Sequence, residues 1–347
     1  MKFTIGNKAA VKAYDFDAAV EAIADGYSRM SDAYEQLVAA EGRCAEAEQV
    51  MENCNAALEA IQRFGVTNTT MAVFNGEGNL DQALGLESLD VSALESLSTT
   101  TKKLRKEKYV AGLEGKVDEL WGKFVQFLKD LWEKIKRFFK ELLDSNAKYV
   151  RLVTEAVKLG TYNGIDEKSD KKMSLITPTM CTKCLDAAAE LLRVVKLGAT
   201  AAVIPTPDAN ILKDVGMTVA DGKIDSSKLN DTIKKVSGTF AECKWTKQAV
   251  KGTADGFVKC AVGADLKAAM QAIDKTAQTA IDVANKAKDD AKAAEAAKAK
   301  KAAMVSASSY ISAYKKLVDR VGTTLVAIAK MPKTAKPEEP KKDPDAE

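Results

Sequence analysis

Cysteine is the residue type in this chain that is best suited to chemistry. The six cysteines are Cys44, Cys54, Cys181, Cys184, Cys243 and Cys260. Cys181 and Cys184 form a C-x-x-C pair, but a structural zinc site needs a second close pair, and Cys243 and Cys260 are too far apart in the sequence to supply it. A redox C-x-x-C normally follows a strand of a βαβ unit, and the sequence shows none. We therefore interpret the cysteines as small apolar residues on helix faces with reduced thiols, and we predict no metal and no cofactor.

Histidine is absent, which removes the commonest general base and the commonest metal ligand. An enzyme would have to rely on carboxylates, lysine, tyrosine or cysteine. The sequence contains no glycine-rich phosphate loop. Its adjacent carboxylates, such as Asp118 with Glu119 and Asp289 with Asp290, point to different sides of a helix. The sequence therefore predicts a protein that is not an enzyme.

The length and the charge of the chain further limit the class of protein that it can be. A chain of 347 residues can form two or three domains with real cores. Charged residues make up 29% of the chain, but the net charge is only +3, which argues against a dedicated nucleic-acid binder. No apolar run approaches the roughly 18 residues that span a bilayer, and residues 1–16 lack the apolar core of a signal peptide. We expect the protein to be cytoplasmic in the cell that produces it.

The most distinctive element is an aromatic-rich helix, expected over residues 100–159, whose apolar positions alternate at spacings of four and three. Lysines and Arg137 occupy its opposite face. The apolar face is predicted to be one buried surface formed by Trp121, Phe124, Leu128, Leu131, Trp132, Ile135, Phe138 and Phe139. Three roles fit such a face: a bundle core, a membrane-surface helix, or a surface for a protein partner or a second copy.

The remaining segments predict an all-α protein of long helices in helical-bundle or coiled-coil units, with a disordered C-terminal tail. A seam repeated at spacings of three and four predicts a long helix in residues 1–65, beginning near Asp15 or Asp17 and ending at Gly65. The other predicted parts are a flexible spacer at 66–102, the aromatic helix at 103–160, a helical body at 161–330 and a tail at 331–347.

Within the helical body, periodicity predicts a helix over 179–197, an alanine-rich helix over 265–294 and a last helix over 306–330. Between them, residues 201–204 and 217–219 are weak strand candidates. A turn is expected at Ala220, Asp221 and Gly222.

The order of these parts resembles the internal head or prohead core proteins of giant tailed bacteriophages. In that family a prohead protease cleaves after a glutamate that is preceded two positions earlier by Ser, Ala or Gly. Gly85-Leu86-Glu87 and Ala93-Leu94-Glu95 match this motif, as do Ala57-Leu58-Glu59 and Gly112-Leu113-Glu114. The resemblance implies processing at Glu87 or Glu95, so that residues 1–95 form a propeptide and the rest is packaged with the genome inside the head.

These observations predict a non-enzymatic structural or assembly protein of the virion. Removal of residues 1–95 would delete an acid-rich segment, so the remaining body would be more basic and able to contact DNA without sequence specificity. The alternative is a membrane-active helical bundle, similar in outline to α-pore-forming toxins or to lipid-surface binders. No small-molecule substrate is indicated.

Overall fold

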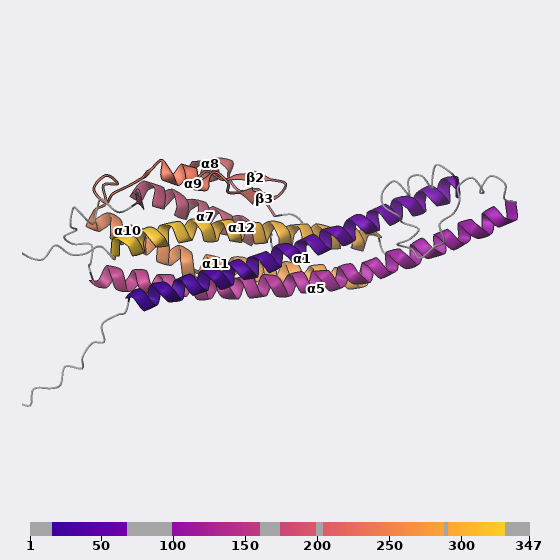
Figure 1. Cartoon of the computed structure of the whole chain (residues 1–347), viewed down its shortest axis with the longest axis horizontal. Coiled ribbons are helices and arrows are strands. Elements are labelled where there is room, and N and C mark those ends of the chain that lie inside the picture. The colour runs from indigo at the N-terminus through magenta and orange to yellow at the C-terminus, as the bar shows by residue number, and fades with distance from the viewer. Residues whose placement is uncertain (1–15, 68–98, 160–173, 199–203, 288–290, 330–347) are drawn as a thin grey trace, which may run out of the picture. The chain divides into compact units, whose positions relative to one another are not determined.

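The structure is a computed structural model that describes residues 16–67, 99–159, 174–198, 204–287 and 291–329. These residues are mostly helical, and the predicted all-α class built from long helices is confirmed. The predicted tail lies outside the described residues, as does most of the predicted spacer. The helices are α1 (Phe16–Phe64), α5 (Thr99–Leu159), α7 (Pro178–Gly198), α8 (Ala209–Asp214), α9 (Leu229–Lys234), α10 (Lys247–Val262), α11 (Ala264–Lys286) and α12 (Ala291–Ala329) (Figure 1).

The chain divides into two compact units, and neither is a continuous stretch of sequence. One, which we call the hairpin unit, comprises the described residues of 34–137 and 276–302. The other, the mixed unit, comprises those of 1–33, 138–275 and 303–347. The four long helices α1, α5, α11 and α12 each contribute residues to both units.

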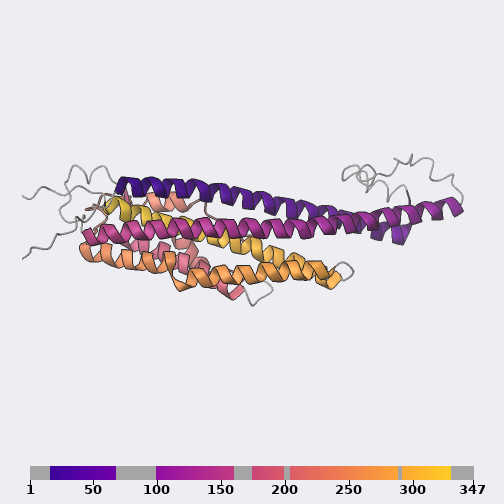
Figure 2. The same ribbon diagram turned by 90° about the horizontal axis from the view of Figure 1, so that it is seen from below.

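In the hairpin unit, α1 and α5 run side by side in opposite directions (Figures 1 and 2). Gln36 of α1 accepts a hydrogen bond from Arg137 of α5 (3.0 Å), and the carbonyl of Gln62 accepts one from Lys106 (2.9 Å). The buried residues of α1 keep a spacing of three and four: Leu37, Ala40, Cys44, Ala47, Met51, Cys54, Ala57 and Ile61. This regular seam is why the segment forms one long helix with a single buried face.

Gly65 ends α1, as the sequence predicts. Its backbone lies in the left-handed region (φ +76°), and its N–H donates to the carbonyl of Ile61 at 2.9 Å. Glycine adopts this conformation without a steric penalty, which is why it terminates helices.

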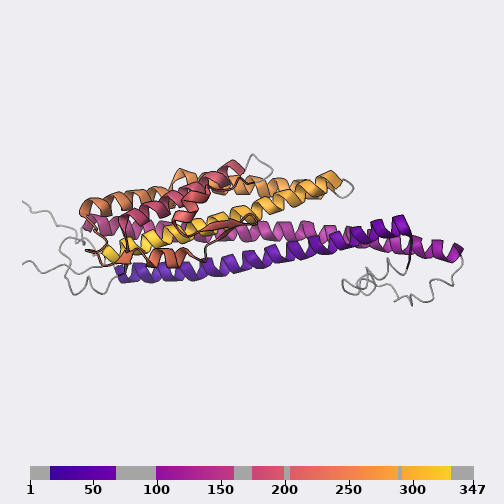
Figure 3. The same ribbon diagram turned by 90° about the horizontal axis from the view of Figure 1, so that it is seen from above.

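The core of the mixed unit is built on α12, whose residues 303–329 bury Tyr310, Tyr314, Leu317 and Val321. Gly322 allows close packing here, because an added Cβ would lie 2.8 Å from Cδ1 of Tyr149 and 3.0 Å from Cε2 of Phe257. Helix α10 packs along α7, and α7 also contacts α8 (Figure 3).

Two small antiparallel sheets complete the mixed unit. Strands β2 (Thr218–Ala220) and β3 (Lys223–Asp225) form a hairpin, and β1 (Leu175–Ile176) pairs with β4 (Ser237–Gly238). Positive φ angles at Asp221 (49°) and Gly222 (71°) make the tight turn that the sequence indicates. Trp245 secures β1 by donating its indole N–H to the carbonyl of Ile176 at 3.0 Å.

The structure corrects two sequence predictions. The alanine-rich helix predicted over 265–294 is divided, since α11 ends at Lys286 and α12 begins at Ala291, well before the predicted start at 306. Alanine favours helix throughout this stretch, so the sequence does not indicate where one helix ends and the next begins. Of the two strand candidates, 217–219 overlaps β2, whereas Ile204 is not in a strand and 201–203 lie outside the described residues.

Among the helices that the structure describes, none combines the length and the apolar character needed to cross a membrane.

Candidate functional site

The predicted aromatic face of α5 points into the interior of the chain. In the hairpin unit Phe124, Leu128, Leu131 and Ile135 are fully buried. In the mixed unit Phe138 and Phe139 are buried, with ring centroids 6.0 Å apart. The two remaining members of the predicted face, Trp121 and Trp132, lie in the hairpin unit and keep some contact with solvent.

The two tryptophans of this face are packed against other side chains and also make polar or charged contacts. Trp121 is partly buried, stacks at a tilt on Phe124 (centroids 5.2 Å apart) and donates its indole N–H to the carbonyl of Ala284 at 3.1 Å. Trp132 is 8% exposed, and the ammonium of Lys136 lies 5.2 Å from its ring centroid. Each tryptophan therefore combines a buried ring with a polar or charged contact at its edge.

Three helices of this chain cover the face in the hairpin unit. The core cluster that includes Phe124 and Leu128 takes Met51 and Ile61 from α1 and the small residues Ala284 and Ala297 from α11 and α12. Small side chains let a helix backbone approach bulky rings closely, so these alanines are the complement of the aromatic residues. Burial of each large side chain contributes about 1.5–3 kcal/mol.

A layer of ionic contacts lies beside this core and joins α1 to its neighbours within the hairpin unit. Arg43 of α1 pairs with Asp130 of α5. Lys298 of α12 pairs with Glu52 of α1 at 3.1 Å. Lys301 pairs with Glu48, and both of these side chains are largely buried (12% and 16% exposed).

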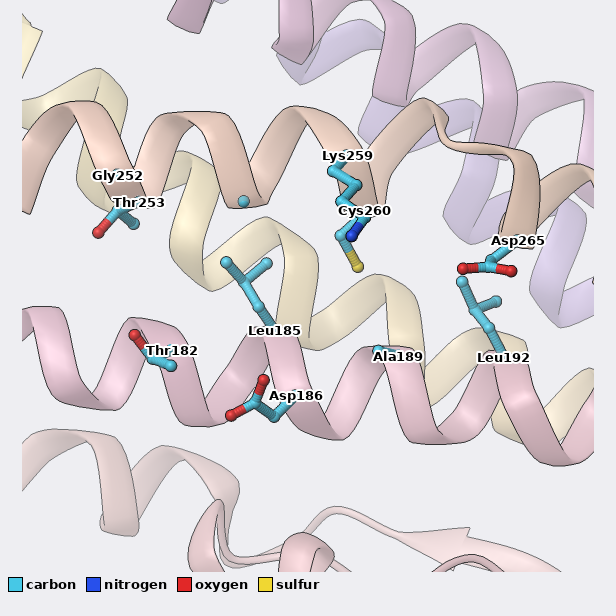
Figure 4. Close-up of a pocket in the computed structure, with 11 residues that line it drawn as sticks. Thr182, Leu185, Asp186, Ala189, Leu192, Gly252, Thr253, Lys259, Cys260 and Asp265 are labelled. Carbon is cyan, nitrogen blue, oxygen red and sulfur yellow. The ribbon is translucent and has the colours of Figure 1, made fainter.

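The mixed unit contains a groove between α7 and α10 with a volume of about 340 Å³ (Figure 4). Thr182 and Asp186 line it from α7, and Lys259 and Cys260 from α10. Asp265, at the start of α11, lines one end and accepts a hydrogen bond from Lys196 at 2.7 Å, which lowers the pKa of its carboxyl. An Asp whose ionised form is stabilised in this way is a weak base near neutral pH.

Sequence reasoning missed a buried polar cluster in the mixed unit. Lys315 and Asp319 of α12 form an ion pair with side chains only 2% and 7% exposed, and the Lys315 ammonium lies 5.3 Å from the ring centroid of Tyr149. Beside them, Asn146 donates to the hydroxyl of Tyr314 (3.2 Å) and to a backbone carbonyl of α10 (2.9 Å). The i,i+4 spacing of Lys315 and Asp319 on an apolar helix face was the signal that could have revealed this cluster.

The structure finds all six cysteines free, and all but Cys260 are buried. Burial raises the pKa of Cys44, Cys184 and Cys260 to about 12, and it raises that of Cys181 further. A thiol is nucleophilic only as a thiolate, so these groups are inert near neutral pH. Within the described residues, no group of three or more Cys, Asp or Glu side chains is placed to hold a metal ion.

The predicted processing sites, Glu87 and Glu95, lie outside the described residues. The other two matches to the cleavage motif are in helices. Glu59 belongs to α1 and Glu114 to α5.

No curated protein and no solved structure matches the chain. The family model of phiKZ-like phage internal head proteins matches residues 17–196, which include nearly all of α1, the whole of α5 and most of α7. This match covers just over half of the chain and includes the aromatic helix. The protein therefore belongs to the family of phiKZ-like phage internal head proteins.

Proposed function

We propose that this internal head protein is a non-enzymatic structural component that is made in the cytoplasm, enters the assembling head with residues 1–95 attached, loses them to a head protease, and remains packaged against the genome. The observation that carries this proposal is the family match over residues 17–196. Family membership also favours the structural interpretation over the membrane-active one.

The helices that contain the other two motifs make Glu87 and Glu95 the better candidates for processing. Proteases bind extended backbone, so a site within a packed helix must unfold locally before it is cut. Ala57-Leu58-Glu59 lies in α1 with Ala57 buried, and Gly112-Leu113-Glu114 lies in α5 with Leu113 fully buried. The other two motifs fall between the end of α1 at Phe64 and the start of α5 at Thr99, so cleavage there would leave both helices intact.

A non-enzymatic role is supported by the side chains that the structure describes. The thiols of Cys44, Cys184 and Cys260 have pKa values raised by burial, and histidine is absent from the sequence. The carboxyl of Asp265, the charged group at the end of the α7–α10 groove, has a lowered pKa because Lys196 donates to it. These groups are suited to packing and ion pairing rather than to proton transfer or nucleophilic attack.

The experiment is mass spectrometry of purified mature heads, compared with proheads. We expect proheads to contain the chain from Met1, and mature heads to contain a form that begins at Ser88 or Ser96. A Glu87→Gln and Glu95→Gln double variant should keep its N-terminus in mature heads, whereas Glu59→Gln should be processed normally. Mature heads that contain the chain from Met1 would refute the proposed processing.

A further inference from the structure

Acidic residues are concentrated in the part of the chain that processing would remove. Residues 1–95 contain 16 Asp and Glu against 6 Lys and Arg, a net charge of −10. The remaining 252 residues contain 33 acidic and 46 basic residues, a net charge of +13, which together with −10 gives the +3 of the whole chain. Cleavage after Glu95 would therefore leave a strongly basic body.

In the hairpin unit, two of these acidic residues form ion pairs with lysines of α12. Glu52 and Glu48 of α1 pair with Lys298 and Lys301 of α12, and Glu295 lies 3.7 Å from Lys298 on its own helix. The Lys298 side chain is only 22% exposed and that of Lys301 only 12%. These two ammonium groups are therefore largely withdrawn from any external anion while α1 is in place.

Three further cationic side chains of the hairpin unit donate hydrogen bonds to α1. Lys134 and Arg137 of α5 donate to the side-chain oxygen of Gln36, at 3.4 Å and 3.0 Å. Lys106 donates to the carbonyl of Gln62 in the last turn of α1, where the helix dipole is negative. Helix α1 thus supplies acceptors to cations from both α5 and α12.

We propose that α1 is a releasable acidic cover, and that its withdrawal opens a surface around Lys298 and Lys301 that binds the phosphate backbone of nucleic acid. This inference rests on the proposed removal of residues 1–95. Carboxylates and phosphates compete for the same ammonium groups, so α1 occupies the positions that the anionic backbone of DNA takes in the processed protein. Packaging of the genome then coincides with exposure of the surface that holds it.

The contacts of α1 in the hairpin unit are compatible with release. Its buried seam mixes the large side chains of Leu37, Met51 and Ile61 with small ones such as Ala40, Ala47 and Ala57, and each alanine contributes less burial free energy than a Leu or Phe. Helix α5 has an independent contact with α11, since Trp121 donates to the carbonyl of Ala284. Once the covalent connection is cut, retention of α1 depends on its concentration and on the salt concentration.

The first test uses the intact chain and does not depend on processing. Glu48→Gln with Glu52→Gln removes the carboxylates that pair with the two lysines. Glu46→Gln with Glu59→Gln is the matched control, because it makes the same charge change on the same helix at exposed positions. Binding of a fluorescent DNA duplex of about 30 base pairs is measured by anisotropy over a series of salt concentrations.

We expect the Glu48 and Glu52 variant to bind roughly tenfold tighter at about 0.1 M salt, with a log–log salt slope steeper by up to about 2. Adding Lys298→Gln and Lys301→Gln should abolish the gain. Equal gains in the variant and its control would show a general charge effect and would overturn the proposal. Circular dichroism establishes that each variant is folded.

The second test cuts the full chain at a protease site inserted between residues 87 and 95 and separates the N-terminal fragment in about 1 M salt, where ion pairs are screened. We expect the body to remain helical and to bind the duplex more tightly than the intact chain does. A body that unfolds on losing α1, or that gains no affinity, would overturn the proposal. Unprocessed protein in mature heads would instead refute only the proposed processing, because both binding tests are made on purified protein.

Discussion

The buried ion pair of Lys315 and Asp319 gives a quantitative prediction about the mixed unit. Both side chains are almost completely withdrawn from water, at 2% and 7% exposure, and the ammonium also lies over the Tyr149 ring. Asp319→Ala leaves a buried ammonium without the carboxylate that pairs with it. Breaking a buried pair in this way costs about 3–5 kcal/mol. At about 2–4 °C per kcal/mol, the melting temperature should fall by roughly 6–20 °C.

Two further variants separate the effect of a buried, unpaired charge on stability from the effect of losing an ion pair. Lys315→Met with Asp319→Leu replaces the pair by apolar side chains of similar size, and it should be close to neutral or stabilising by about 1–4 kcal/mol. Asp214→Ala removes the partner of Lys183 in an ion pair of the same unit whose side chains are 44% and 54% exposed, and it should cost at most about 1 kcal/mol. Urea unfolding followed by circular dichroism measures all three. If Asp319→Ala costs no more than Asp214→Ala, the buried pair does not behave as its geometry indicates.

The same variants have a pH dependence of known sign. Burial lowers the pKa of Lys315 below its ordinary value of 10.5, and Asp319 opposes that shift. Without Asp319 the pKa falls further, so the unfolded chain holds this proton at pH values where the folded chain has lost it. Stability then rises with pH over that window. The deficit of Asp319→Ala relative to the apolar double variant should therefore shrink as the pH is raised from 7 towards 10.5.

Three more predictions follow from packing and burial. Phe124→Ala should lower the free energy of unfolding, measured in urea, by about 3–5 kcal/mol. Leu104→Ala, at a side chain 56% exposed on the same helix, should change it by about 0.5 kcal/mol or less. Equal losses of stability in the two variants would mean that the aromatic face is not a core. Gly322→Ala should destabilise the protein by about 1–3 kcal/mol, because the new methyl group would clash with Tyr149 and Phe257. Gly115→Ala, whose methyl group meets nothing within 4 Å, should stabilise the protein by up to about 1 kcal/mol. A stabilising effect of Gly322→Ala would contradict the close packing at this glycine. Cys184, with its pKa raised to about 12, should resist a disulfide reagent at about pH 8 until the protein is unfolded, and rapid labelling of the folded protein would refute its burial. Because the unfolded chain loses this proton at a lower pH than the folded chain, the contribution of Cys184 to stability should be lost as the pH rises from 9 towards 12.

The sequence by itself determined the helices and several of their ends. The alternating apolar positions of the aromatic-rich segment predicted a long amphipathic helix over residues 100–159, and α5 spans Thr99–Leu159. Gly65 predicted the end of α1 because glycine adopts the left-handed conformation readily. Both are local properties, since helical periodicity and backbone preference depend on residues only a few positions apart. The order of the predicted parts, including the spacer with its cleavage motifs, also indicated the phage family.

Only the tertiary structure decided what each face packs against. A seam shows that a helix must bury one side, but the choice of Met51, Ile61, Ala284 and Ala297 around Phe124 depends on segments far apart in the sequence. The two-residue strands β1 and β4 are too short to carry a periodic signal, and they exist because distant backbone groups pair. Lysines such as Lys298 and Lys315 look alike in the sequence, yet one meets a carboxylate of α1 and the other is buried in the core. Their difference comes from long-range packing, which determines whether a charge is solvated, paired or enclosed.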